Sequence, residues 1–184
     1  KESRAQAENQ ARRSLEELEA SVLATIEQVA TRNDPYVGGT LLDLDTHGGV
    51  LPLWSRRRLE QTGVQLMKQL QLDLLYLLDD KGVVLDAPHY RPAEGETKAE
   101  LLARGKSAAG RAYFSMQPVL DSEQIRTVLM VEAIGRLEEG GSSVTVAGAK
   151  NVTADLLEVV RQLSQVQARI VSASGEAIVA SESE

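Results

Sequence analysis

Apolar residues recur at steps of three and four over residues 1–31, a spacing that places them on one face of an α-helix. The stretch has no glycine or proline and is rich in Ala, Glu and Arg, which favour helix. Its first ten residues have little apolar content, so we expect them to project as a stalk or to pair with another chain. An ordinary amphipathic helix with a frayed start is the alternative. The apolar face consists of Ala11, Leu15, Leu18, Val22, Ile26 and Val29.

A second helix and an apolar hairpin follow. Asn33-Asp34-Pro35 breaks the first helix, and helix is predicted again from Pro52 to about Gln71, with proline at the first turn. Residues Asp73–Leu78 are nearly all apolar, which is typical of a central strand. A tight turn at Asp79-Asp80-Lys81-Gly82 leads into the partner strand, Val83–Asp86.

The second half of the chain predicts further strands. Gly110–Leu120 and Gln124–Gly135 form the next expected hairpin, in which Glu132 interrupts an apolar run. Short helical turns are expected at Thr40–Leu44 and Ala99–Ala103. Towards the end of the chain the pattern predicts a short strand at Val144–Ala147, a helix from Ala154 to about Gln165, and a last hairpin of Ala168–Ser172 and Ala177–Ser181.

A helix–strand–turn–strand pattern occurs twice, in residues 64–87 and 157–180. Gly82 and Gly175 occupy the same place in the two copies, in the turn between the strands. Such a repeat indicates a duplicated helix–hairpin unit. Because helix–hairpin motifs recur in many folds, two chance copies are the alternative.

Length and composition bound the class of protein. The 184 residues suit one domain, or one domain and a partial second, and 42% hydrophobic content is enough for a core. Aromatic residues make up only 3%, so the core must consist of Leu, Val, Ile and Ala. The formal net charge of −7 disfavours nucleic acid as a partner. The one basic cluster, Arg56-Arg57-Arg58, is too short to form a nucleic-acid-binding surface.

The chain has no cysteine, which excludes thiolate catalysis, disulfides and cysteine-bound zinc. It has no run of about 18 apolar residues that would span a membrane, and no visible signal peptide. Because it begins at Lys1, we expect it to be a piece of a longer protein.

Little in the sequence indicates catalysis or a metal. Asp43, Asp45 and His47 alternate before a Gly pair, but three residues do not fill a coordination shell, so we interpret them as a polar loop and expect no metal site. Ser55 and Ser115 lack a histidine base in a nucleophile elbow. We therefore expect no catalytic residues, no cofactor and no enzymatic activity.

Two segments resemble the Cache (also called PDC) sensor domains, which lie outside the membrane in bacterial histidine kinases and chemoreceptors. They are LDLLYLLDDKGVVLDAP (72–88) and RAYFSMQPVLDSEQIRTVLMVEAIG (111–135), and the tail GEAIVAS (175–181) resembles the same hairpin again. The resemblance implies an α+β fold, with a central antiparallel sheet and a long N-terminal helix packed on it. Residues 1–139 would form the sensor domain, and residues 140–184 either a partial second helix–hairpin unit or the completion of the first.

The resemblance also implies a function. The chain would be the periplasmic input domain of a membrane-bound sensor histidine kinase, with transmembrane helices outside this segment. A small ligand would shift the sheet relative to the N-terminal helix, and this helix would form a homodimer contact. The alternative is a ligand-free structural or adaptor domain whose long helix binds a partner.

Candidate site residues follow from the position of the family's pocket, between the sheet and the segment that joins the two hairpins. His89, Tyr90, Arg111 and Tyr113 fall there. Arg binds a carboxylate with two hydrogen bonds, and Tyr adds an apolar wall with a hydroxyl. Trp54 and Arg57 are added as large polar side chains of the kind that such a pocket uses, as are Arg58 and Tyr76. Alternatively, Tyr113 packs in the core and the others are solvated. The expected dimer helix presents Leu15, Leu18, Val22 and Ile26.

Overall fold

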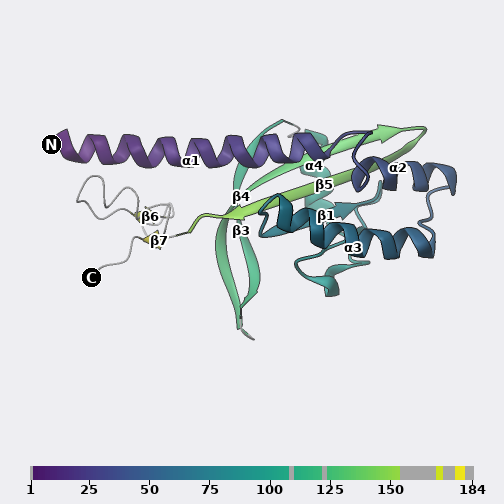
Figure 1. Ribbon diagram of the computed structural model, residues 1–184. Helices are drawn as coiled ribbons and strands as arrows, with labels where there is room; N and C mark the ends of the chain where they lie inside the picture. The colour runs from purple at the N-terminus through teal and green to yellow at the C-terminus, as the bar shows by residue number, and fades with distance from the viewer. Residues whose placement is uncertain (1, 108–109, 122–123, 154–168, 172–176, 181–184) are drawn as a thin grey trace. The chain divides into compact units, whose positions relative to one another are not determined.

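The computed structural model describes residues 2–107, 110–121, 124–153, 169–171 and 177–180 (Figure 1). The helices are α1 (Glu2–Val29), α2 (Val37–Thr46), α3 (Leu53–Gln69), the 3₁₀ turn η1 (Arg91–Ala93) and α4 (Ala99–Ser107). The strands are β1 (Leu74–Leu78), β2 (Val84–Asp86), β3 (Ala112–Asp121), β4 (Gln124–Glu139), β5 (Ser142–Asn151), β6 (Arg169–Val171) and β7 (Ala177–Ala180).

Five strands form one sheet in the order β2-β1-β5-β4-β3. β1 pairs antiparallel with both β2 and β5, and Tyr76 lies opposite Ala147. The predicted α+β fold with a central antiparallel sheet is therefore confirmed. Gly82, at φ 80, supplies the left-handed residue of the β1–β2 turn.

β5 lies in the middle of this sheet, so residues 142–151 complete the first sheet rather than begin a second unit. The strand is longer than the predicted Val144–Ala147. β6 and β7 form a separate antiparallel pair, as the predicted last hairpin requires. The helix expected at 154–165 lies outside the described residues, and so does the proposed repeat over most of its second copy.

The chain divides into two compact units. One comprises Ser21–Tyr113 and Glu132–Lys150, and we call it the sheet unit. The other comprises Lys1–Ala20, Phe114–Val131 and Asn151–Glu184. Within the second unit, the backbone N–H of Val152 donates to the Leu129 carbonyl at 2.9 Å, and both side chains are buried. Among the described residues, no helix is long and apolar enough to cross a bilayer.

The C-terminal half of α1 packs on one face of the sheet unit. Ile26 is fully buried above two strand glycines. A Cβ on Gly148 would lie 2.5 Å from the Ile26 side chain, and a Cβ on Gly135 would lie 2.5 Å from that of Ala30. Glycine at both positions is thus what permits the close approach of helix and sheet. The predicted packing of the long helix on the sheet is confirmed for this part of α1.

The opposite face carries α4 and the segment after β2. A Cβ on Gly105 of α4 would lie 3.0 Å from Thr145 and 3.3 Å from Ile134. Because side chains alternate along a strand, Thr145 faces away from Gly148 and so away from α1. The core on this face consists of Leu78, Val84, Ala87, Ala93, Leu101, Ile134 and Ala147, with Tyr76 and Tyr113 packed against it.

α2 and α3 lie side by side in the sheet unit (Figure 1), and α3 also contacts β1 and β2. α2 is longer than the short turn predicted at Thr40–Leu44. It forms despite its Gly pair because Asp34 accepts hydrogen bonds from the first free backbone amides, those of Tyr36 (2.9 Å) and Val37 (2.8 Å). Gly38 is required there, since a Cβ would lie 2.1 Å from the Arg32 carbonyl oxygen.

The burial of side chains on α1 reduces the number of residues that are available for the predicted dimer contact. Val22 and Ile26 are fully buried within the chain, because they hold α1 on the sheet, so they are not available to a second chain. Leu15 and Leu18 lie in the other unit and are half-buried. A contact between chains stays a prediction for these two residues alone.

Candidate functional site

Two of the predicted site residues meet on the α4 face of the sheet unit. Tyr76 of β1 contacts the ring of His89 edge-on, with ring centroids 4.5 Å apart. Nδ1 of His89 lies 3.0 Å from the carbonyl oxygen of Leu75. Burial lowers the pKa of His89 to about 4, and the hydrogen bond to Leu75 opposes this only in part. At neutral pH, His89 is therefore an uncharged hydrogen-bonding group held in a fixed position.

A buried carboxylate lies on the same face. Glu132 of β4 is fully buried and, two residues from Ile134, points to the side that α4 covers. Burial raises the pKa of Tyr113, and the negative charge of Glu132 raises it further. The guanidinium of Arg104, from α4, lies over the Tyr113 ring, 4.9 Å from its centroid. We call Tyr76, His89, Arg104, Tyr113 and Glu132 the tyrosine cluster.

Cations of the chain itself occupy the aromatic faces of the cluster. Besides Arg104, the Lys98 ammonium lies 5.9 Å from the centroid of Tyr76, and it pairs with Glu96 at 2.8 Å. An aromatic face beside a carboxylate attracts positive charge, more strongly where water is excluded. The arrangement suits the binding of a small cation, in competition with two exposed or half-exposed side chains.

The remaining predicted residues do not all join this cluster. Tyr90 is 44% exposed at the start of η1, and Arg111 is exposed just before β3. Trp54 instead packs beside α2, with its ring 6.3 Å from that of His47 and 5.7 Å from the Arg58 guanidinium. Arg57 is exposed on the same helix, α3. The structure therefore does not bring Trp54 and Arg57 together with the tyrosine cluster, because α3 and α4 pack on opposite faces of the sheet.

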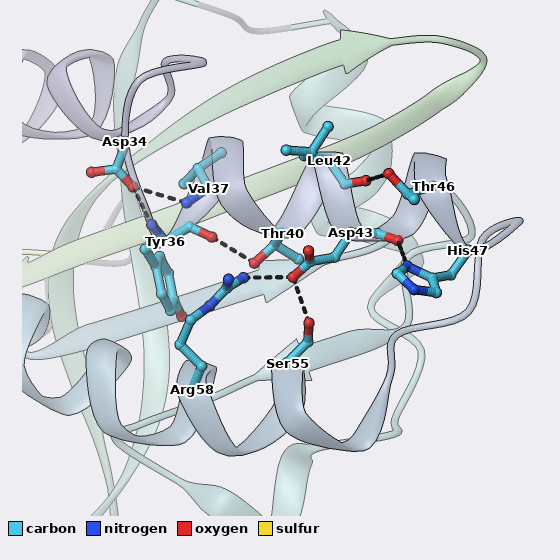
Figure 2. A network of polar contacts seen from close by, with 10 residues as sticks. All are labelled: Asp34, Tyr36, Val37, Thr40, Leu42, Asp43, Thr46, His47, Ser55 and Arg58. Atoms are coloured by element: carbon cyan, nitrogen blue, oxygen red, sulfur yellow. Dashed lines mark hydrogen bonds and ion pairs between the residues drawn. The ribbon is translucent and has the colours of Figure 1, made fainter.

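The polar residues before Gly48 hold α2 against α3 (Figure 2). Oδ2 of Asp43 accepts hydrogen bonds from Ser55 at 2.5 Å and from Arg58 at 2.6 Å. Nδ1 of His47 lies 2.8 Å from the carbonyl oxygen of Asp43. In the part of the chain that the structure describes, no group of three carboxylate or histidine side chains is placed to bind a metal.

A second buried carboxylate, Asp86, ends β2. It is 1% exposed, accepts a hydrogen bond from the Tyr36 hydroxyl at 2.7 Å, and pairs with Arg91. Asp86 lies opposite Leu77 in the strand register, whereas Tyr76 faces the tyrosine cluster, so Asp86 points to the α3 side. Burial raises its pKa to about 6.

Two hollows in the described part of the sheet unit have neither Asp86 nor Glu132 in their lining. One of about 540 Å³ runs between the end of α1 and α3, beside Gln28 and Gln65. Another of about 330 Å³ lies beside Arg56, Glu60 and Glu94. Neither is lined by a residue of the tyrosine cluster, which in this conformation is covered by its own cations.

Sequence reasoning missed Arg104, Glu132 and Asp86. The one available signal was Glu132, a charge inside an apolar strand. A charge in the middle of a buried strand is costly, so it is a reason to look for a site. Asp86 gave no such signal, because an Asp at a strand end is ordinary in a turn.

Comparison by sequence gives no match to a protein-family model or to a curated protein. Comparison of structures gives clear matches. The periplasmic domain of Vibrio cholerae LuxQ aligns with a TM-score of 0.62 at 14% identity, over 97% of this chain and 78% of that domain. The sensor domain of the V. cholerae histidine kinase DctB aligns with a TM-score of 0.57 at 14% identity, over 99% and 69%.

At these identities the likeness concerns the fold. The chain thus has the α+β fold of bacterial periplasmic sensor domains, and the Cache-like fold predicted from its sequence is confirmed.

Proposed function

We propose that the chain is the extracytoplasmic input domain of a bacterial membrane-bound sensor histidine kinase. The fold it shares with the LuxQ and DctB domains supports this, and one observation carries it further. Glu132 is a fully buried charge on a strand, next to Tyr113. Burying a carboxylate is costly. Groups with perturbed ionisation, such as Tyr113 with its raised pKa, gather at functional sites more often than elsewhere.

The tyrosine cluster is the proposed ligand site. A ligand with an amino group would place it against Glu132 and displace the Arg104 guanidinium from the ring of Tyr113. Neutral His89 would hydrogen-bond a polar part of the ligand. Tyr90, at the exposed edge, would contact the ligand's far end, and Arg111 would meet a carboxylate if the ligand has one.

α1 is the proposed output. Its C-terminal half is fixed to the sheet through Val22 and Ile26, and the same helix continues to Glu2. A ligand shifts such a helix only as far as it prefers one conformation over the other. Movement of α4 and the strands on ligand binding would pass through the sheet to α1 and along it.

Thermal shift tests the ligand site. Small amines, amino acids, carboxylates and sugars are screened against the chain, and a ligand at a hundred times its Kd raises the free energy of unfolding by about 2.7 kcal/mol. We expect a hit among the amino-group compounds. Glu132→Gln should abolish the shift, whereas Glu138→Gln, the same change at an exposed position of the same strand, should preserve it. A hit that survives Glu132→Gln would contradict this site.

Cross-linking tests the homodimer. Leu15→Cys should join two chains under mild oxidation, and Val22→Cys, fully buried, should not. If neither ligand shift nor cross-link is found, the ligand-free structural or adaptor role becomes the better description. If only the cross-link is found, the long helix is a dimerisation element without a ligand input.

A further inference from the structure

The Asp86 site joins four elements of the sheet unit. The carboxylate ends β2 and is 1% exposed. Tyr36, just before α2, donates its hydroxyl to Oδ2 at 2.7 Å. Arg91, in η1, pairs with Oδ1 of Asp86, pairs with Glu94 at 2.6 Å, and donates to the carbonyl oxygen of Glu60 in α3 at 2.8 Å.

The backbone of α3 closes the remaining side. A Cβ on Gly63 would lie 2.0 Å from Oδ2 of Asp86 and 2.9 Å from Pro88, so the helix backbone lies directly on the carboxylate. The charged or titratable groups that face Asp86 are therefore Tyr36 from the α2 side and Arg91 and Glu94 from the η1 side. α3 contributes Gly63 and β1 contributes Leu77, neither of which carries charge.

We propose that Asp86 and Arg91 form a proton-operated latch that gives the chain a proton input separate from any small ligand. When the Asp86 carboxylate takes a proton from the solvent, it becomes a neutral acid and no longer pairs with the guanidinium. Arg91 keeps Glu94 and the Glu60 carbonyl, so its side chain moves away from Asp86 and shifts residues 90–94. The ion pair between Asp86 and Arg91 breaks, whereas the backbone hydrogen bonds of Gly95 and Glu96 to Val84 of β2 stay in place.

We expect Asp86 to take up its proton at mildly acid pH. Burial raises the pKa of Asp86 to about 6, and this outweighs the opposing effects of the Tyr36 hydrogen bond and of Arg91. His89, a half-buried titratable group nearby, has its pKa lowered to about 4 and keeps its charge state between pH 5 and 7. The segment that moves follows directly after His89, and so connects the latch to the tyrosine cluster.

Nuclear magnetic resonance tests the latch on this 20.0 kDa chain. The side-chain carboxyl carbon of Asp86 is followed from pH 4 to 8, together with the backbone amides of residues 87–96. We expect a carboxyl midpoint near 6 and amide shifts with the same midpoint. Asp86→Asn should remove the amide transition, whereas Asp80→Asn, at an exposed carboxylate, and His47→Gln should leave it in place.

Tyr36→Phe provides a second variant that keeps the carboxylate. It removes a hydrogen bond that favours the charged form, so the midpoint should move to higher pH. A carboxyl midpoint below about 4.5 would overturn the proposal, since that is the range of an ordinary Asp. An amide transition in residues 87–96 that is unchanged in Asp86→Asn or Tyr36→Phe would overturn it equally.

Discussion

Asp86 and Glu132 are two buried carboxylates on opposite faces of one sheet, and they are held in different ways. The oxygens of Asp86 are held by Tyr36 and Arg91, and the backbone of Gly63 closes the site. Glu132 lies beside Tyr113, and the nearby cation, Arg104, comes from an exposed position of α4. The first arrangement is a joint between elements, in which the partners of the carboxylate come from Tyr36, Arg91 and the α3 backbone. In the second, the nearby cation is an exposed side chain, and for this reason we propose it as the ligand site.

Gly63→Ala is the strongest test of the closed joint. The new Cβ would overlap Oδ2 of Asp86, which Tyr36 and Arg91 hold from the other sides. We expect a loss of at least about 3 kcal/mol in the free energy of unfolding, at the upper end for overpacked sites. Denaturant unfolding measures it.

Gly39→Ala is the matched control, because it is also a glycine inside a helix. There the nearest atom to a Cβ is the Arg58 guanidinium at 3.5 Å, an ordinary contact. This variant should be neutral or more stable by up to about 1 kcal/mol, since Ala favours helix over Gly. Equal effects of the two substitutions would show that α3 does not press on the carboxylate.

The Asp86 charge also predicts how stability varies with pH. The pKa of Asp86 is about 6 in the folded chain, above the ordinary value of 3.8, so the folded state binds more protons between these values. The stabilisation is therefore fully present below pH 3.8 and is lost as the pH rises to 6. It amounts to at most about 3 kcal/mol. The unfolding free energy of the wild type, relative to that of Asp86→Asn, should therefore fall as the pH rises through this window. Above pH 7 the difference between the two should be constant.

Arg91→Ala measures how much the cation beside Asp86 contributes to the free energy of unfolding, for comparison with Arg104 beside Glu132. At pH 8 it leaves the Asp86 charge buried without its cation partner, and removing one partner costs about 3–5 kcal/mol for a wholly buried pair. Arg91 is about one third exposed, so we expect a loss of about 2 kcal/mol. At pH 5, where Asp86 is protonated, the loss should fall below about 1 kcal/mol. A loss independent of pH would indicate that Arg91 acts through Glu94 and Glu60 instead.

The sequence predicted the parts of the fold in which local chemistry and packing agree. The β1–β2 hairpin has an apolar run on either side of a Gly82 turn, and α3 begins at a proline that suits a first helical turn. β5 was predicted too short because its middle, around Ala147 and Gly148, consists of small residues with little strand preference. Gly148 permits the approach of Ile26 of α1, a contact that no local pattern reveals.

The structure brings together only some of the residues that the sequence proposed for a site. His89 and Tyr113 lie on the face that the resemblance implied. Trp54 and Arg57 have the right chemistry but belong to a helix on the other face, and a linear sequence does not show which face a helix covers. Arg104 lies just beyond the helical turn predicted at Ala99–Ala103 and gave no signal, because its position over Tyr113 depends on how α4 crosses the sheet.

Arg104→Ala is the smallest expected change in stability and the sharpest test of the open site. Arg104 is exposed, and substitution of an exposed residue usually alters the free energy of unfolding by no more than about 0.5 kcal/mol. Removing Arg104 also removes the cation that competes with an incoming amine for the face of Tyr113 and for the charge of Glu132. Amine binding, measured by calorimetry, should therefore strengthen while stability hardly changes. Weaker binding would mean that Arg104 contacts the ligand directly, and the ligand would then carry an acidic group at that position.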